Sequence, residues 1–121
     1  MGLIVQKFGG TSVADSEKIK NVARAVIKEK LNGNDVITVV SAMGHTTDNL
    51  IKLSKEITLK PQEREMDMLM SVGEQISMSL LAMAINEMGY KAISMTGLQA
   101  GIQTEAKHLS ARILNIDTKK V

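Results

Sequence analysis

The residues best suited to chemistry lie near the start of the chain, where Lys7 is followed by Gly9-Gly10 and then by Thr11-Ser12. Glycine has no Cβ, so a glycine pair lets backbone N–H groups turn toward an anion, and lysine adds a compact positive charge beside them. The two hydroxyl groups supply further hydrogen bonds. This pattern favours a cradle for a phosphate or a carboxylate, although not a Walker A loop, because the lysine precedes the glycines. An ordinary strand-to-helix turn with two glycines fits the local pattern equally well.

A second loop of small and hydroxyl residues runs from residue 41 to residue 48. Both loops follow predicted strands, and open α/β sheets bind ligands at the carboxyl ends of their parallel strands. The two loops are therefore placed where a ligand would bind. Thr47 or Asp48 also fits a simple helix cap, and we interpret His45 as a solvated loop residue.

Glu74 is the only formally charged residue between Asp67 and Glu87, in a stretch that otherwise reads as an apolar helix. A carboxylate is rarely buried without a partner, and the residues one helical turn away offer no cation. Glu74 therefore lies on a solvent-exposed stripe or meets a cation from elsewhere, for which a substrate ammonium group would serve. The local pattern leaves both interpretations open.

The elements that must position these residues begin with a strand, a helix and a second strand. The apolar run at residues 3–8 predicts a short buried strand. A helix follows, capped by Asp15 or Ser16, with apolar residues at the i, i+3, i+4, i+7 spacing, and the Asn-Gly-Asn sequence at residues 32–34 ends it. The β-branched run at residues 36–40 predicts a central parallel strand covered on both faces. Together these elements form a βαβ unit.

Two further helices occupy the middle of the chain. Helical signals continue to Ile57, and Pro61 supplies a first-turn proline for a new helix. From about Glu63 to Met88 the pattern is helical and apolar, which predicts a core helix buried nearly all round. Polar residues interrupt this stretch, so it does not fit a membrane span, and we attribute its many methionines to the filling of gaps in a core.

A third strand is predicted at residues 92–96 and a last one at residues 113–116. Between them lies a glycine-containing loop that is followed by Arg112. A guanidinium group can bind a carboxylate through two parallel hydrogen bonds, which suits an amino-acid substrate. A surface arginine beside an edge strand is the alternative interpretation of Arg112.

Composition narrows the classes of function. A chain of 121 residues is one domain at most, and its net charge of +2 and nearly aromatic-free sequence argue against binding to nucleic acid or to an acidic membrane surface. The absence of cysteine excludes a disulfide framework and is compatible with a reducing cytosol. The apolar run at the start is too short for a signal peptide. We therefore expect a soluble, cytoplasmic protein.

Four separated blocks of sequence resemble the aspartokinases, which are enzymes of the amino-acid-kinase fold. The blocks are Lys7-Phe8-Gly9-Gly10-Thr11-Ser12-Val13, residues 41–48, Ser71-Val72-Gly73-Glu74-Gln75-Ile76-Ser77 and residues 96–104. The resemblance implies an α/β fold with three αβα layers and a mostly parallel central sheet. It also implies an ATP-dependent kinase that phosphorylates the side-chain carboxylate of L-aspartate, the first step toward lysine, threonine and methionine.

The resemblance further implies roles for individual residues. Lys7, as the catalytic residue, would neutralise the transferring phosphoryl group together with the glycine loop. Ser41 and Thr47 would hold the side-chain carboxylate of aspartate, Glu74 its ammonium group and Arg112 its α-carboxylate. The full set comprises Lys7, Gly9, Gly10 and Ser12 for phosphate and Ser41, Ala42, Thr47, Glu74 and Arg112 for the substrate. ATP and Mg²⁺ are the implied cofactors, although no ligands for Mg²⁺ are visible, and we expect a homo-oligomer.

Length is the main departure from this family, whose members continue with a nucleotide-binding part and with ACT regulatory domains. We therefore expect residues 1–121 to be the amino-terminal, substrate-binding part of a kinase domain, without the nucleotide-binding remainder, and to be inactive alone. Two alternatives remain open. One is a kinase for a different amino acid, and the other is a non-catalytic module that binds an amino acid or serves in assembly.

Overall fold

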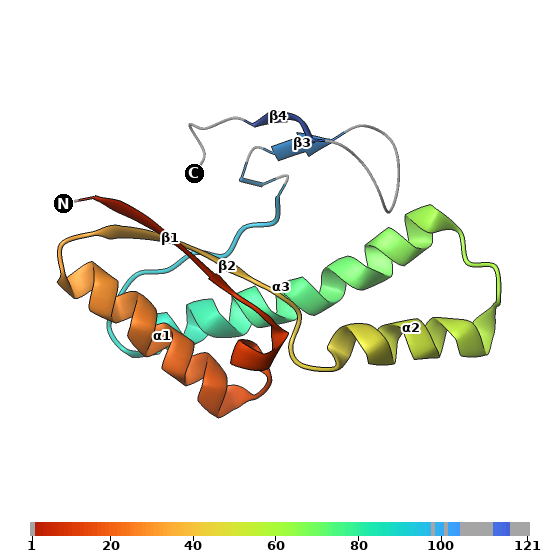
Figure 1. Ribbon diagram of the computed structural model, residues 1–121, viewed down its shortest axis with the longest axis horizontal. Coiled ribbons are helices and arrows are strands. Elements are labelled where there is room, and N and C mark those ends of the chain that lie inside the picture. The colour runs from red at the N-terminus through yellow and green to blue at the C-terminus, as the bar shows by residue number, and fades with distance from the viewer. Residues whose placement is uncertain (1, 98, 101, 105–112, 117–121) are drawn as a thin grey trace.

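The structure is a computed structural model that describes residues 2–97, 99–100, 102–104 and 113–116. Strands and helices alternate through the first half of the chain and a long helix follows them (Figure 1). The elements are β1 (Leu3–Phe8), the 3₁₀ helix η1 (Gly10–Val13), α1 (Ser16–Leu31), β2 (Asp35–Val40), α2 (Thr46–Ile57), α3 (Glu63–Glu87), β3 (Ile102–Thr104) and β4 (Ile113–Ile116).

The first two strands form a parallel pair, as the sequence predicted. Their register runs from Leu3 opposite Asp35 to Phe8 opposite Val40. The pairing extends one residue further toward the start, where the Asp35 N–H donates to the Gly2 carbonyl over 2.8 Å. Both strands therefore end at the same edge, and this brings the loops that follow them to one place.

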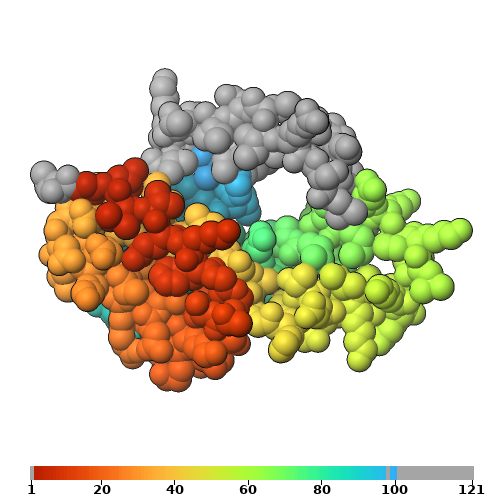
Figure 2. Space-filling view, viewed as in Figure 1, coloured from red at the N-terminus to blue at the C-terminus, as the bar shows by residue number. Residues whose placement is uncertain are grey.

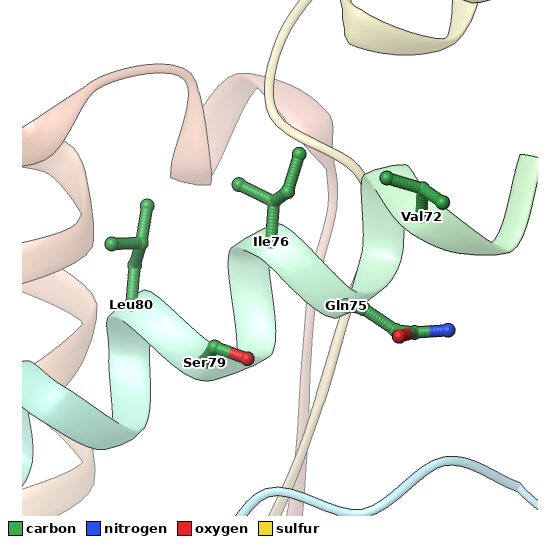
Figure 3. Close-up of a pocket in the computed structure, with 5 residues that line it drawn as sticks. All are labelled: Val72, Gln75, Ile76, Ser79 and Leu80. Carbon is green, nitrogen blue, oxygen red and sulfur yellow. The ribbon is translucent and has the colours of Figure 1, made fainter.

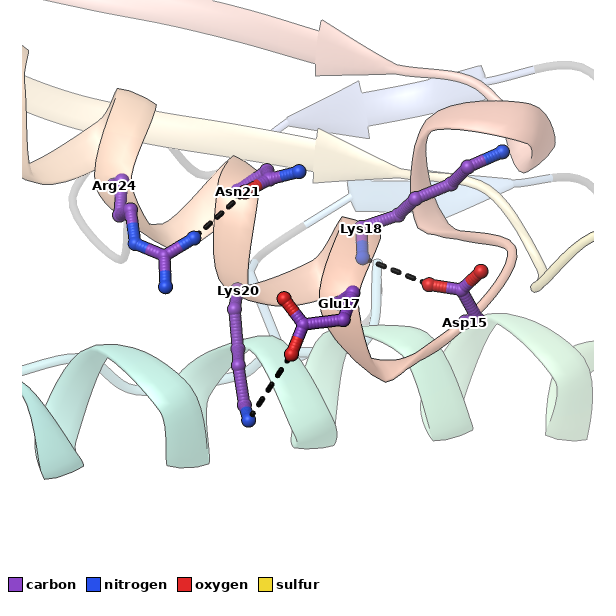
Figure 4. A network of polar contacts seen from close by, with 6 residues as sticks. All are labelled: Asp15, Glu17, Lys18, Lys20, Asn21 and Arg24. Carbon is purple, nitrogen blue, oxygen red and sulfur yellow. Dashed lines mark hydrogen bonds and ion pairs between the residues drawn. The ribbon is translucent and has the colours of Figure 1, made fainter.

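Helix α1 connects these strands and begins and ends where its sequence indicates. The Asp15 carboxylate accepts a hydrogen bond from the Lys18 N–H over 2.9 Å, which caps the first turn (Figure 4). At the other end, Gly33 takes a φ of 90°, a left-handed conformation that glycine adopts without strain. A second exposed pair on the same helix joins the Lys20 Nζ to the Glu17 carboxylate over 3.6 Å.

The hydrophobic core lies between one face of the β1–β2 sheet and the helices α1 and α3. Phe8, Val36 and Val40 of the strands pack against it. Its buried members are Val13, Ile19, Val22, Ala23, Val26, Leu81 and Ile85. Burial of these side chains is the main source of stability in this part of the molecule. Figure 2 shows the red to orange part of the chain, from β1 to β2, as one continuous body, from which α2 and the start of α3 extend.

The opposite face of the sheet is exposed among the described residues. Leu3, Val5 and Val39 keep 62%, 64% and 49% of their surface accessible. The expectation that the second strand would be covered on both faces is therefore wrong for this part of the chain. The reason is that α1 and α3 pack against each other within one core and so lie on the same side.

The buried residues of helix α3 form a single line spaced four apart, which consists of Gly73, Ser77, Leu81 and Ile85. The expectation that it would be buried nearly all round is wrong. Its exposed apolar residues are Met68, Val72, Ile76, Leu80 and Met83. Figure 3 shows Val72, Ile76 and Leu80 side by side at an open pocket that Gln75 and Ser79 also line. An apolar composition all round the helix does not reveal on which sides other elements pack.

By length and composition, α3 is the one helix in the described part of the chain that could cross a membrane. Core helices of soluble proteins share these properties, and the packing of Leu81 and Ile85 against α1 is of that kind.

The predicted strand at residues 92–96 does not form. This segment has no sheet partner among the described strands, because β1 and β2 pair with each other and β3 pairs antiparallel with β4. The Asn86 side chain holds its start instead, accepting from the Ala92 N–H over 2.8 Å and donating to the Ala92 carbonyl over 3.4 Å. The predicted last strand, residues 113–116, is present as β4. The α/β class is confirmed.

Candidate functional site

The glycine loop follows β1 directly and curls into the short helix η1. Gly9 stands before η1 with an extended backbone, and its carbonyl accepts from the Ser12 N–H over 3.1 Å. Lys7 lies one residue before the end of β1, opposite Val39, and its side chain is on the exposed face of the sheet. The sequence alone did not indicate η1, because its four residues carry no helical periodicity.

The loop after β2 is hydrogen-bonded to the glycine loop. The Ser41 N–H donates to the Phe8 carbonyl over 3.1 Å, and the Gly44 N–H donates to the Gly10 carbonyl over 3.0 Å. Space between the loops is small, because a Cβ on Gly10 would stand only 3.0 Å from the Ala42 carbonyl oxygen. Gly44 has a φ of 44°, which explains the need for glycine there. The two predicted loops are therefore brought together.

Helix α3 supplies the third side of this site. A Cβ built on Gly73 would stand 2.9 Å from the Ala42 Cβ and 3.4 Å from the Thr46 Cγ2, so the loop after β2 rests directly on the helix backbone. Glu74 follows Gly73 and is exposed, and Thr47 follows Thr46 and is half-buried. The structure thus gathers three of the segments that carry the predicted residues. Arg112 lies outside the described residues.

The start of α2 differs from the expectation. Neither Thr47 nor Asp48 caps it, because the helix begins at Thr46 and His45 occupies the capping position without a side-chain hydrogen bond. His45 is 91% exposed, in agreement with a solvated loop residue, but its Nδ1 lies 3.7 Å from the Asp48 carboxylate. The three-residue spacing on a helix start was the signal for this pair, and it was missed.

Two charges in this region have no ionic partner in the part of the chain that the structure describes. Neither Lys7 nor Glu74 forms an ion pair with any residue that the structure describes. Both side chains are exposed, so neither carries the cost of burying an unpaired charge. A cation and a carboxylate that remain free in this way are available to a ligand that carries both signs of charge.

A metal site is not visible in the described part of the chain. No three His, Asp or Glu side chains come together there, and Mg²⁺ prefers oxygen ligands, chiefly carboxylates and phosphates. We therefore assign no described residue as a ligand of the Mg²⁺ that the resemblance implies.

A model of the amino acid kinase family matches residues 2–121. The chain belongs to the amino acid kinase family.

Individual members of the amino acid kinase family show how much of a longer protein this chain matches. The aspartokinase of Bacillus sp. (strain MGA3) is 65% identical over 121 residues, which is 100% of this chain and 29% of that protein. Aspartokinase 2 of Bacillus subtilis (strain 168) is 60% identical over 118 residues, again 29% of its length. The crystal structure of aspartate kinase from Synechocystis superposes with a TM-score of 0.79 at 52% identity, covering 83% of this chain and 17% of that one. The chain thus spans about 29% of the length of these curated relatives.

Sequence reasoning missed three residues that build the site. Gly44, Thr46 and Gly73 shape the contacts between the loops and α3. Apart from its place in one of the four resembling blocks, the signal for Gly73 was a glycine inside a strongly helical pattern, which is unfavourable for a helix and therefore indicates a packing reason.

Proposed function

We propose that residues 1–121 form the aspartate-binding and phosphate-binding part of an aspartate kinase. Support comes from the relatives that carry the name aspartokinase at 60–65% identity over nearly the whole chain. The observation that supports the proposal most is the meeting of the two loops with α3. Lys7 and Glu74 belong to these segments, and neither forms an ion pair with a residue that the structure describes.

The proposed reaction moves the γ-phosphoryl group of ATP onto the side-chain carboxylate of aspartate. A carboxylate oxygen forms the new bond to phosphorus, the bond to the β-phosphate oxygen breaks, and ADP leaves with that electron pair. No general base is needed, because a carboxylate is already ionised at pH 7. Catalysis then depends on positioning and on stabilising the charge of the transferring group.

In the proposal, Lys7 and the glycine loop stabilise the negative charge of the transferring phosphoryl group. Lys7 is the last residue but one of β1, and Gly9, Gly10 and Ser12 follow it in the glycine loop and η1. Backbone N–H groups in a turn form a concave surface that binds anions. Lys7 is the catalytic residue in this scheme.

The substrate contacts come from the second loop and from α3. Ser41 and Thr47 hold the side-chain carboxylate, Glu74 pairs with the ammonium group, and Arg112 pairs with the α-carboxylate. Ala42 is buried and faces Gly73, so its contribution is through its backbone. Glu74 is exposed and forms no ion pair with a described residue, so binding the ammonium group would break no ion pair among those residues.

The proposal assigns the remaining functions to the part of the relatives that this chain does not span. Those functions are the binding of adenosine and of Mg²⁺, so the 121-residue chain should not phosphorylate aspartate alone. We also propose a cytoplasmic homo-oligomer. The exposed apolar residues of the sheet face and of α3 support association, since large exposed apolar areas commonly mark interaction sites.

A chimera tests this function. Residues 1–121 replace the matching part of the Bacillus sp. (strain MGA3) aspartokinase, and ADP release is followed with ATP, Mg²⁺ and a panel of amino acids. The proposal expects turnover with aspartate, much less with glutamate, and none with the 121-residue chain alone. Lys7→Ala should lower kcat far more than it changes the aspartate KM, because the interaction strengthens as charge develops.

The outcome of the chimera separates the candidate functions. A folded chimera that turns over another amino acid in preference to aspartate would identify a different amino-acid kinase. A folded chimera without any turnover would favour a binding or assembly module. Aspartate-dependent turnover by the isolated chain would show that the proposed division of the active site is wrong.

A further inference from the structure

Gly73 of α3 lies in tight contact with Ala42 in the loop after β2. A Cβ on Gly73 would stand 2.9 Å from the Ala42 Cβ. Carbon atoms in good contact are about 3.5–4.0 Å apart, so any side chain at this position would push the loop and the helix apart by roughly 0.6 Å or more. Ala42 has little freedom to withdraw, because it is only 9% exposed.

Both sides of this contact are held in place. On the loop side, the Ala42 carbonyl oxygen lies 3.0 Å from where a Gly10 Cβ would be, and the next-but-one residue, Gly44, is hydrogen-bonded to Gly10. On the helix side, the fully buried Ser77 donates its hydroxyl to the Gly73 carbonyl over 3.4 Å. A strain introduced here therefore moves the loop relative to the helix and is not absorbed by one side chain.

The residues proposed to hold aspartate lie directly beside this contact. Ser41 precedes Ala42, Thr47 follows Thr46, and Glu74 follows Gly73. Ser41 and Thr47 bind one end of the substrate in the proposal, and Glu74 binds the ammonium group. The distance between these two groups of aspartate is limited by three covalent bonds, so the spacing of loop and helix must match it. Charge-assisted hydrogen bonds of about 2.7–2.9 Å weaken when their partners are moved apart.

We infer that Gly73 is a positioning residue, whose missing side chain sets the spacing between Glu74 and the carboxylate-binding loop and so sets the affinity for aspartate. The inference rests on the proposed function. It adds Gly73 to the proposed site as a residue that acts through Glu74 and the carboxylate-binding loop. A glycine in the middle of a helix costs about 0.5–1 kcal/mol relative to alanine, which is the physical reason to seek such a role.

The test introduces Gly73→Ala into the active chimera and measures KM for aspartate and for ATP separately. The aspartate KM should rise about tenfold or more, because small displacements of binding groups have large effects, while the ATP KM changes less than about twofold. A purely structural role would lower the amount of active enzyme and leave both KM values unchanged. Thermal unfolding of the same variant records the stability.

A second substitution at the same contact provides the matched control. Ala42→Gly removes the Cβ that the new side chain would meet, leaving Thr46 Cγ2 at 3.4 Å as the nearest side-chain atom. The aspartate KM of the Gly73→Ala/Ala42→Gly chimera should therefore lie within about threefold of that of Ala42→Gly alone. If Gly73→Ala does not fold, Ala42→Ser adds bulk from the other side of the contact and should show the same selective rise.

The results distinguish this inference from the proposed function. A wild-type chimera without aspartate-dependent turnover would overturn the proposed function and with it this inference. An active chimera in which Gly73→Ala and Ala42→Ser both leave the aspartate KM unchanged would overturn the inference alone. Equal rises in both KM values, or no recovery in the double variant, would also contradict it.

Discussion

The two glycines of the first loop should respond in opposite ways to the same substitution. A Cβ on Gly9 would meet no atom within 4 Å, whereas a Cβ on Gly10 would meet the Ala42 carbonyl oxygen at 3.0 Å and the Gly44 backbone at 3.6 and 3.7 Å. Gly9 has a φ of −80°, and neither glycine is among those with a positive φ. Backbone conformation therefore permits alanine at both positions, and only the space differs.

Two opposing effects determine how much each substitution changes the free energy of unfolding. Replacing glycine by alanine at a compatible position stabilises a protein by about 0.4–1 kcal/mol, because the unfolded chain loses freedom. This gain applies to both positions, so Gly9→Ala should be slightly more stable than the wild type. At Gly10 the overpacking costs about 1–3 kcal/mol, which should make Gly10→Ala less stable than Gly9→Ala by that amount.

Urea unfolding of the 121-residue chain, followed by circular dichroism, measures both free energies of unfolding. Equal stabilities for the two variants would refute the tight contact between the loops. The same two variants also test the phosphate cradle in the chimera. Gly9→Ala should keep its stability and still lose activity, since the space that its Cβ fills is the space that the proposed phosphate needs.

Three further outcomes concern the scaffold and its surface. Asp15→Ala should lower the free energy of unfolding by about 0.5–2 kcal/mol in a urea titration, because it removes the cap of α1. Leu81→Ala, at 4% exposure, should cost about 2–5 kcal/mol, while Met83→Ala on the same helix, at 63% exposure, should change stability by less than about 0.5 kcal/mol. Lys30, whose Nζ lies 2.9 Å from the Asp35 carboxylate and hydrogen-bonds to it, holds the pKa of Asp35 below its ordinary value of 3.8. The pair therefore stabilises the fold above that value and ceases to do so as the pH falls through the lowered pKa, and Lys30→Ala should raise the pKa in an NMR titration.

The local sequence pattern was sufficient to predict the elements whose bounds depend mainly on their own residues. The first strand matches its predicted bounds, the second begins one residue early, and Asp15 caps α1 as expected. β-Branched runs and cap residues act over a few positions, so they can be read from a single sequence.

Features that depend on contacts with residues distant in the sequence could not be predicted from the local pattern. The apolar composition of α3 gave no information on which sides would be covered, so the exposure of Val72 and Ile76 was not foreseen. A strand also needs a neighbour to pair with, and residues 92–96 have none among the described elements. Gly73 is a case of the same kind, since its role lies in its contact with Ala42, which is distant in the sequence.

The candidate site was predicted through motifs, and its geometry was not. Glu74 was recognised as a single charge in an apolar helix, but the pattern left open whether it faced solvent or a ligand. The structure shows it exposed, without an ion-pair partner among the described residues, and next to the contact of α3 with the loop. Both earlier interpretations are compatible with this position, because a binding residue is exposed until its ligand arrives.

The measurement that tests the central claim most directly is the aspartate affinity of a Glu74→Gln chimera. Loss of a hydrogen bond between charged groups should weaken binding by about 1–3 kcal/mol, or roughly 5-fold to 150-fold in KM, with stability kept. Glu87→Gln, an exposed glutamate at the far end of α3, is the matched control and should leave the aspartate KM unchanged. The account predicts a rise in the aspartate KM for Glu74→Gln only. An unchanged aspartate KM in that variant would contradict the claim that this chain binds the substrate ammonium group through Glu74.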